Sequence, residues 1–308
     1  MRSGSVTDEL TVLSYGGGQD SWTILVLLAR DEDFRSRYAP GDLWVAMSDT
    51  GDEHDQTYEH IRYTRNFCEK HGISFTHITR DLGFHVPSWP SLIEHYQAYN
   101  TIGSASFNKT CTDQLKIRVF YKWLSTKLVA DYGMPASGKH GPKQPIVEFC
   151  DRNKTKIKVL LGIAGDEQKR VAKANEFEFK CGKWMQNRIE RVYPLIDLDW
   201  GREDCQGYLK SVGEPIPMPS NCMRCYFMSP IELLWLFRNH PDKFAEWVVL
   251  EKAKLRANTH MGDKNYGVYG KRTLSEKLDK AIEEFGHMSD DELTEYKMSH
   301  GHCVGSRY

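Results

Sequence analysis

The stretch Leu10-Thr-Val-Leu-Ser-Tyr-Gly-Gly-Gly-Gln-Asp-Ser21 is the part of the chain that decides its fold. Residues 10–14 are short, apolar and β-prone, three consecutive glycines follow, and residues 20–30 form an apolar run of helical length. A strand that ends in glycines and leads into a helix is typical of parallel α/β sheets. We therefore expect this turn to face a ligand, because such sheets bind ligands beyond the carboxyl ends of their strands.

The same alternation of strands and helices continues along the chain. The predicted strands are residues 42–49, 73–78, 157–163 and 191–197, and the predicted helices are residues 54–71, 112–131, 202–212 and 230–256. Residues 84–109 are expected to form a loop or lid. The pattern predicts a doubly wound parallel α/β domain over residues 1–200, then a mainly helical region over residues 201–308 with a Cys-x-x-Cys loop and a polar tail.

Composition sets limits on the class of protein. The chain has 308 residues, of which 40% are hydrophobic and 12% aromatic, as expected for a packed globular protein. Its formal net charge is −1, so any contact with nucleic acid requires a local basic patch. The N-terminus has no apolar core of signal-peptide length, and no apolar run is long enough to span a bilayer. We therefore expect a cytoplasmic protein with no membrane contact, whose eight cysteines are reduced.

The glycine turn has the features of an anion site. Gly16, Gly17 and Gly18 let the backbone N–H groups approach an oxyanion, and the following helix adds its positive end. Ser21 can donate a hydroxyl to phosphate, and Asp20 can hold Mg²⁺ against phosphate oxygens. No Gly-Lys-Ser/Thr follows, so the turn is not a Walker A loop. A plain strand-to-helix turn is the alternative, but three glycines would be an unstable choice for one.

Residues 14–21 resemble the PP-loop of the adenine nucleotide α-hydrolase superfamily, whose signature is Ser-Gly-Gly-x-Asp-Ser. Gly16 stands where the family usually has serine, and Gln19 replaces a frequent lysine. Ser14, two residues upstream, is the candidate for the missing hydroxyl. The resemblance implies that the turn binds the phosphates of ATP.

Later motifs resemble one branch of that superfamily, the phosphoadenylyl-sulfate (PAPS) reductase-like proteins. They are the Asp49-Thr50-Gly51 segment, the turn from Gly162 through Gly165 and Asp166 to Arg170, the run Tyr193-Pro-Leu-Ile, and Cys222-Met-Arg-Cys225. The resemblance implies that Asp49, Thr50, Gly162, Gly165 and Asp166 frame adenosine, and that Arg170 faces phosphate.

Two chemistries compete within this branch. The intact glycine turn favours Mg²⁺-dependent cleavage of ATP to AMP and pyrophosphate, which activates an acceptor for sulfur or nitrogen transfer. The alternative is a thiol-dependent PAPS reductase that makes sulfite, with Cys303 of the tail as its nucleophile beside two histidines. A third reading, from another class, is a nucleotide-binding regulatory subunit without turnover.

Three cysteines are candidate metal ligands. Cys222 and Cys225 form half of a ligand set, and Cys111 lies in a segment that resembles the Cys-Cys-x-x-Arg-Lys element of the branch. The resemblance implies a [4Fe–4S] cluster ahead of zinc. The fourth ligand is then absent, or it comes from Cys181, Cys205 or Cys303. Reduced cysteines in a packed core are the alternative.

Basic residues are dense in the middle of the chain. They are Lys139, Lys143, Arg152, Lys154, Lys156 and Lys158, with a further group between Lys169 and Arg191. Such a patch can bind nucleic-acid phosphates, although a solvated surface is the simpler reading for isolated lysines. The partners considered are an adenine nucleotide, a nucleic-acid acceptor, a sulfur-donor protein and a second copy of the chain in a homodimer.

Overall fold

A computed structural model describes residues 9–107, 110–167 and 183–300, and it leaves out the side chains of residues 166 and 183. Its centre is one five-stranded sheet in the order β3-β2-β1-β4-β5, with every neighbouring pair parallel. The strands are β1 (Leu10–Ser14), β2 (Asp42–Ser48), β3 (Ser74–Ile78), β4 (Ile157–Leu161) and β5 (Ile189–Val192). The predicted doubly wound parallel α/β fold is confirmed.

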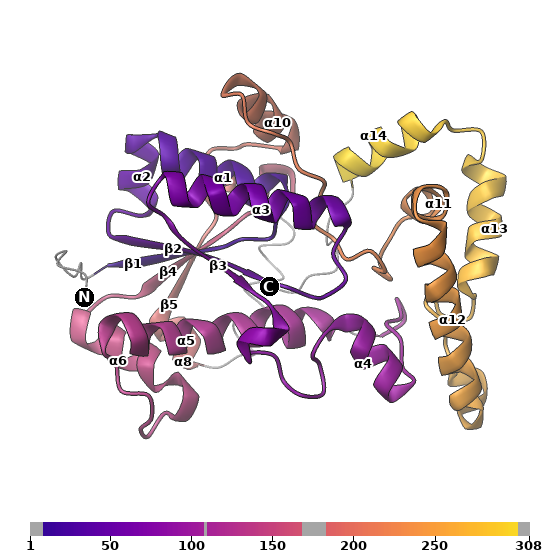
Figure 1. Cartoon of the computed structure of the whole chain (residues 1–308), viewed down its shortest axis with the longest axis horizontal. Helices are drawn as coiled ribbons and strands as arrows, with labels where there is room; N and C mark the ends of the chain where they lie inside the picture. The colour runs from indigo at the N-terminus through magenta and orange to yellow at the C-terminus, as the bar shows by residue number, and fades with distance from the viewer. Residues whose placement is uncertain (1–8, 108–109, 168–182, 301–308) are drawn as a thin grey trace.

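Helices cover both faces of this sheet (Figure 1). One face carries α1 (Gln19–Arg30), α2 (Glu32–Tyr38), α3 (Asp55–Lys70) and α10 (Arg202–Ser211); the other carries α5 (Arg118–Tyr132), α6 (Gln144–Asn153) and α8 (Lys183–Arg188). Because successive side chains of a strand point to opposite faces, Val12 and Leu13 of β1 enter different cores. Helix α1 is buried over most of its length, since it lies between the sheet and α10.

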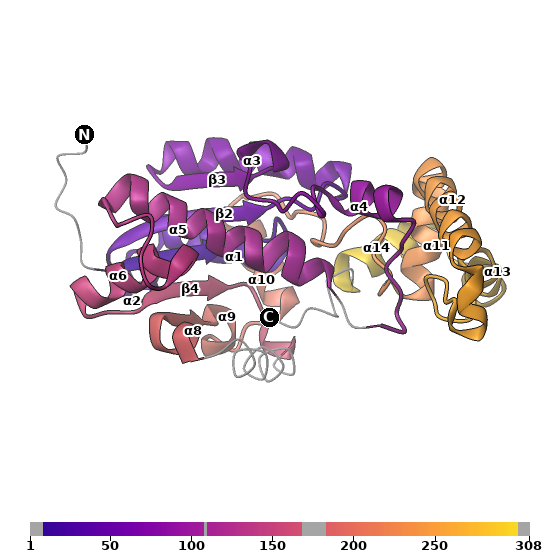
Figure 2. The same cartoon turned by 90° about the horizontal axis from the view of Figure 1, so that it is seen from below.

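A second group of helices stands at one end of the sheet (Figure 2). It comprises α11 (Pro230–Asn239), α12 (Pro241–Ala257), α13 (Leu274–Phe285) and α14 (Asp290–His300), which share a third core. The predicted helix over residues 230–256 is two helices, because Pro241 cannot continue α11 and begins α12 instead. The expected polar tail contains α13, which begins at a capping box formed by Thr273 and Glu276.

Two further segments differ from expectation. Residues 84–109 contain α4 (Leu92–Tyr99), capped by Ser91, within what the sequence predicts as a loop. The predicted strand over residues 191–197 ends at Val192, because Pro194 begins the short helix α9 (Pro194–Asp197). The short 3₁₀ elements are η1 (Arg80–Leu82), η3 (Gly141–Lys143), η4 (Gly165–Glu167) and η5 (Thr259–Lys264), the last with a kink at Gly262, and η2 (Thr112–Ile117) is a π-helix. Within the described ranges, no helix is both long and apolar enough to cross a membrane.

Candidate functional site

The glycine turn lies where the strand order reverses. The chain moves outward from β1 to β3 in one direction and from β4 to β5 in the other, so the crevice between β1 and β4 is the expected ligand position. The turn after β1 and Gly162 after β4 meet there. A Cβ on Gly162 would lie 2.7 Å from the backbone nitrogen of Ser21, so only glycine allows β4 to end against the start of α1.

The three positions of the turn require glycine for different physical reasons. Gly17 alone among them has a positive φ, +77°, a conformation that other residues rarely adopt. The hydroxyl of Ser21 accepts a hydrogen bond from the Gly16 N–H at 3.1 Å and donates one to the Gly18 carbonyl at 3.2 Å. The predicted phosphate ligand Ser21 therefore braces the turn in this structure.

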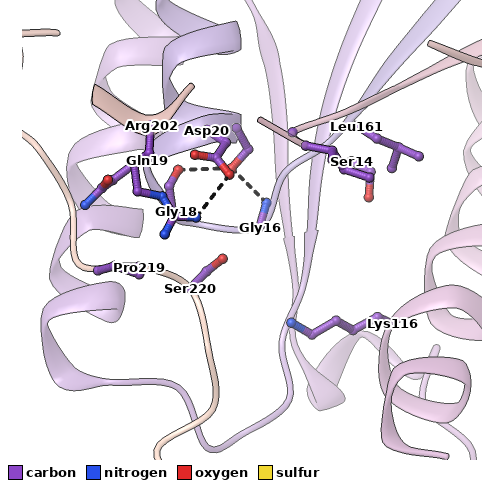
Figure 3. Close-up of a pocket in the computed structure, with 13 residues that line it drawn as sticks. Ser14, Gly16, Gly18, Gln19, Asp20, Lys116, Leu161, Arg202, Pro219 and Ser220 are labelled. Atoms are coloured by element: carbon purple, nitrogen blue, oxygen red, sulfur yellow. Dashed lines mark hydrogen bonds and ion pairs between the residues drawn. The ribbon is translucent and has the colours of Figure 1, made fainter. Parts of the chain in front are cut away.

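A polar cavity opens beside the turn (Figure 3). It is lined by Ser14, Gly16, Gly18, Gln19, Asp20, Ser21, Lys116, Leu161, Gly162, Ile163, Arg202, Pro219 and Ser220. A guanidinium nitrogen of Arg202 lies 3.7 Å from a carboxylate oxygen of Asp20, and another donates to the Ser299 carbonyl at 2.7 Å. Arg202 is only 9% exposed and begins α10, where the helix dipole opposes a cation. Arg202 is thus a buried cation on the wall of the polar cavity, and it faces the Asp20 carboxylate.

The side-chain amide of Gln19 is hydrogen-bonded to other parts of the protein. Its Nε2 donates to the carbonyls of Pro217 at 3.1 Å and Met298 at 3.2 Å, and its Oε1 accepts from Gln206 at 3.0 Å. The side chain thus ties the glycine turn to the C-terminal helices. Arg202 and Lys116 bring positive charge to the same cavity.

An apolar cavity adjoins the polar one. It shares Ser14, Gly16, Lys116 and Leu161 with it, and adds Tyr15, Ser48, Ile117, Phe120, Tyr121, Val159 and Arg191. The empty volumes are about 670 Å³ and 630 Å³, openings to solvent included. One cavity offers cations and backbone N–H groups, and the other offers aromatic and aliphatic walls. Together they have the character of a site for a phosphorylated aromatic base.

Asp49 and Thr50 line neither of these two cavities. The Asp49 carboxylate accepts hydrogen bonds from Tyr58 at 3.0 Å and from the Gly51 N–H at 2.8 Å, and it lies 3.4 Å from His77. Burial by itself raises the pKa of Asp49, but these partners outweigh it and the pKa falls below its ordinary value. The carboxylate is thus an ionised anchor between β2 and β3.

The remaining predicted nucleotide residues divide into two groups. Gly162 lines the polar cavity, and the Gly165 N–H donates to the Trp200 carbonyl at 2.7 Å, which fixes the turn after β4. The Asp166 side chain, Arg170 and Cys303 lie outside the described parts of the chain. Their predicted roles stay predictions.

The three candidate metal ligands line the same cavity. Cys111, Cys222 and Cys225 line a third cavity, the cysteine cavity, together with Thr50, Leu92, Thr112, Lys116, Arg224 and Tyr226. Its empty volume is about 340 Å³ and its exposed lining is almost wholly apolar. Cys205, a proposed fourth ligand, is instead buried in the core beside α1. Cys181 and Cys303 lie outside the described residues.

The environment of Cys222 disfavours a free thiolate. Desolvation, then the carboxylate of Glu53, raises the pKa of the Cys222 thiol well above its ordinary value, and Lys116 opposes this. A cation bound in the cavity would reverse the balance by displacing the proton. Across the described residues, no three His, Cys, Asp or Glu side chains converge on a single ion position.

Lys116 lines all three cavities. It lies in the last turn of the π-helix η2, in which the Arg118 N–H bonds the Asp113 carbonyl five residues earlier. Because Cys111 and Lys116 are also five residues apart, this wider turn brings both to the cysteine cavity. The Lys116 ammonium lies 3.8 Å from the buried carboxylate of Glu53. Sequence reasoning noticed the segment but not this position.

Apart from Arg191, the basic residues of the middle segment whose side chains the structure describes do not line the cavities. Lys156 and Lys158 lie at the amino end of β4, whereas the cavities lie at its carboxyl end. Lys143 sits over the ring of Trp184, 4.6 Å from its centroid. Arg191 is the exception, since it lines the apolar cavity.

Arg202 and Ser220 are site residues that sequence reasoning missed. They lie far from the glycine turn along the chain and belong to no motif. One signal was available for Arg202: an arginine at the start of a predicted helix, where acidic residues are preferred.

No protein-family model matches this chain, and no curated protein matches it significantly. Among solved structures, the chain is similar to the U34-tRNA thiolase NcsA from Methanococcus maripaludis, in a structure with its [4Fe–4S] cluster. The match covers 93% of this chain and 76% of the thiolase chain, with a TM-score of 0.41 and 14% sequence identity. A match at this level adds nothing to what the cavities themselves show about activity.

Proposed function

We propose that this chain is a PP-loop enzyme of the PAPS reductase-like branch that cleaves ATP to AMP and pyrophosphate. The observation that carries the proposal is the pair of adjoining cavities at the carboxyl ends of β1 and β4. Phosphates would occupy the polar cavity, and adenosine the apolar one. Gly162 would contact the nucleotide from the wall of the polar cavity, and Asp49 would support it from outside the two cavities.

The reaction is a substitution at the α-phosphorus of ATP. An acceptor oxygen forms a bond to that phosphorus while the bond to the bridging oxygen breaks, and pyrophosphate leaves. A sulfur or nitrogen nucleophile then displaces AMP from the adenylylated acceptor. Arg202 and Lys116 supply positive charge where the leaving group gains negative charge, in a partly buried site where such charges act strongly.

Asp20 is the residue that would hold Mg²⁺. Magnesium in nucleotide sites is bound through one or two carboxylates and the phosphates of the substrate. Asp20 fits this pattern, because its carboxylate lines the polar cavity at the start of α1. Bound there, Mg²⁺ would neutralise charge on pyrophosphate.

Cys111, Cys222 and Cys225 are the residues that would hold a [4Fe–4S] cluster. With three protein thiolates, the cluster would supply one open iron for sulfide or substrate. The proposed acceptor is a nucleic acid, and the sulfur donor a protein. Iron and acid-labile sulfide measured in anaerobically purified protein test the cluster; colourless, iron-free protein would exclude it.

The reductase alternative keeps one structural observation in its favour. The end of α14 lies at the polar cavity, where the Ser299 carbonyl accepts from Arg202, and Cys303 follows four residues later in the sequence. The wild-type protein and a Cys303→Ser variant should be incubated with Mg²⁺, ATP and sulfide as the sulfur nucleophile, with and without nucleic acid, and separately with PAPS and a small-molecule thiol as the reductant that releases sulfite. We expect AMP and pyrophosphate from both proteins. Sulfite made only by the wild type would show the reductase, and ATP binding without any product would show a regulatory subunit.

A further inference from the structure

Ser220 fills the space that two glycines of the turn leave open. A Cβ on Gly18 would lie 2.8 Å from both the backbone nitrogen and the hydroxyl oxygen of Ser220. A Cβ on Gly16 would lie 3.2 Å from the same hydroxyl. Unlike Gly17, these two glycines have no positive φ, so their backbone does not require glycine. Their missing side chains instead make room for Ser220.

The hydroxyl of Ser220 is placed for a ligand. It lines the polar cavity, and Figure 3 shows the side chain beside Gly18, with its oxygen directed toward Gly16. Within the described part of the chain, the Ser220 hydroxyl has no hydrogen-bond partner. The Ser21 hydroxyl, by contrast, is already bonded to Gly16 and Gly18. Ser220 therefore has the donor capacity at this turn that Ser21 lacks.

The loop holds Ser220 in place from both sides. Before it, the Pro215 and Pro217 carbonyls accept hydrogen bonds from Trp22 and Gln19 at 3.1 Å each. After it, Asn221 is fully buried and accepts from the ammonium of Lys297 at 2.7 Å. The Met223 N–H then bonds the Asp52 carbonyl at 2.6 Å. This position is fixed by the fold before any ligand arrives.

We propose that Ser220 donates a hydrogen bond to the phosphate held by the glycine turn. The inference rests on the proposed function, because it assigns a further ligand in the same nucleotide site. Cys222, which lines the cysteine cavity, follows two residues later in the same loop. One short loop thus supplies a phosphate ligand to one cavity and a thiol to the other.

A Ser220→Ala variant tests the assignment, because it keeps the Cβ that packs on the turn and removes only the hydroxyl. A hydrogen bond to a charged group contributes enough for a roughly tenfold to hundredfold loss of affinity. We expect that loss for pyrophosphate and ATP in calorimetric titrations, with adenosine binding and the melting temperature unchanged. Ser211→Ala, an exposed serine of α10, is the matched control and should bind like the wild type.

A second pair of variants separates hydrogen bonding from packing. Gly16→Ser alone should weaken pyrophosphate binding, because its side chain meets the Ser220 hydroxyl. The double variant Gly16→Ser/Ser220→Ala should recover most of the affinity, since a hydroxyl returns to nearly the same space. A pyrophosphate affinity of Ser220→Ala within twofold of the wild type would overturn the inference. So would a result in which Ser14→Ala loses pyrophosphate affinity and Ser220→Ala does not. A wild-type protein that binds neither pyrophosphate nor ATP would overturn the proposed function as well.

Discussion

The polar cavity and the cysteine cavity are neighbours whose walls differ in charge and polarity. The polar cavity uses backbone N–H groups, a carboxylate and two cations, and it opens beside the start of a helix. The cysteine cavity is almost wholly apolar, and its surroundings keep the Cys222 thiol protonated. The first suits a ligand with a large negative charge, and the second suits a group that must be shielded from water. The difference indicates two separate chemical tasks.

Lys116 marks the boundary between these tasks, because it lines both cavities and lies near Glu53. If the tasks are separate, substitutions in one cavity should leave the other function largely intact.

The largest expected effect is on turnover, in an Asp20→Asn variant. This change keeps the shape of the side chain and removes the charge that would hold Mg²⁺. We expect the release of AMP and pyrophosphate to fall by roughly 10²- to 10³-fold, the usual effect of losing one group that stabilises transition-state charge. Asp33→Asn on the exposed surface of α2 is the control. Iron content should not change, and turnover equal to that of the control would refute the assignment of Asp20.

The next effect is on phosphate affinity, in an Arg202→Gln variant. Removing a buried cation from the polar cavity should weaken pyrophosphate binding about tenfold to hundredfold, because a charged hydrogen bond contributes about 1.5–3 kcal/mol. Arg256→Gln, at an exposed position of α12, should bind normally. Titration of both variants with pyrophosphate measures the effect. Equal affinities would mean that Arg202 only secures the end of α14.

Sequence reasoning predicted some residues of the polar cavity and missed others. The strand, the glycine turn and Asp20 are consecutive in the chain, so local pattern places them together. Arg202 and Ser220 reach the same cavity only through the packing of α10 on α1 and the path of the loop before Cys222. No local pattern carries that information.

For the cysteine cavity too, the sequence predicted part of the site and could not predict the rest. The sequence predicted that Cys111, Cys222 and Cys225 act together, and the structure places them around one cavity. The sequence could not show that Cys205 is enclosed in a different core, or that a π-helical turn brings Lys116 to the same cavity as Cys111. Burial and helix geometry depend on tertiary packing, which a ligand-spacing pattern does not describe.

The stability of the fold around α1, the helix that begins at the polar cavity, should also depend on pH through His60. This side chain of α3 packs edge-on against Trp22 of α1, with ring centroids 4.8 Å apart. Burial lowers the pKa of His60 to about 4 from its ordinary 6.5. The folded state therefore prefers neutral His60, and the stability this gives is present above pH 6.5 and lost as the pH falls toward 4.

Urea unfolding at pH 7.5 and pH 5 measures this dependence. We expect wild-type protein to lose about 2 kcal/mol more of its unfolding free energy than a His60→Phe variant, which keeps an aromatic ring and cannot titrate. The difference between the two proteins removes the contribution of the other titrating groups. An equal pH dependence in both would show that His60 is protonated in the folded protein at pH 5.

The smallest expected effect is the one that most directly tests the separation of the two cavities. In Cys222→Ser, a hydroxyl of similar size replaces the thiol, so the loop that carries Ser220 should keep its path. We expect bound iron to fall clearly below that of a Cys150→Ala control, whose cysteine lies in a different core, while ATP affinity changes by less than about threefold. Metal analysis and ATP titration of the same samples give both numbers. If ATP affinity instead fell about tenfold or more, the loop would transmit the loss of the thiol ligand to the phosphates. The two cavities would then be parts of one site, and Lys116 would join them.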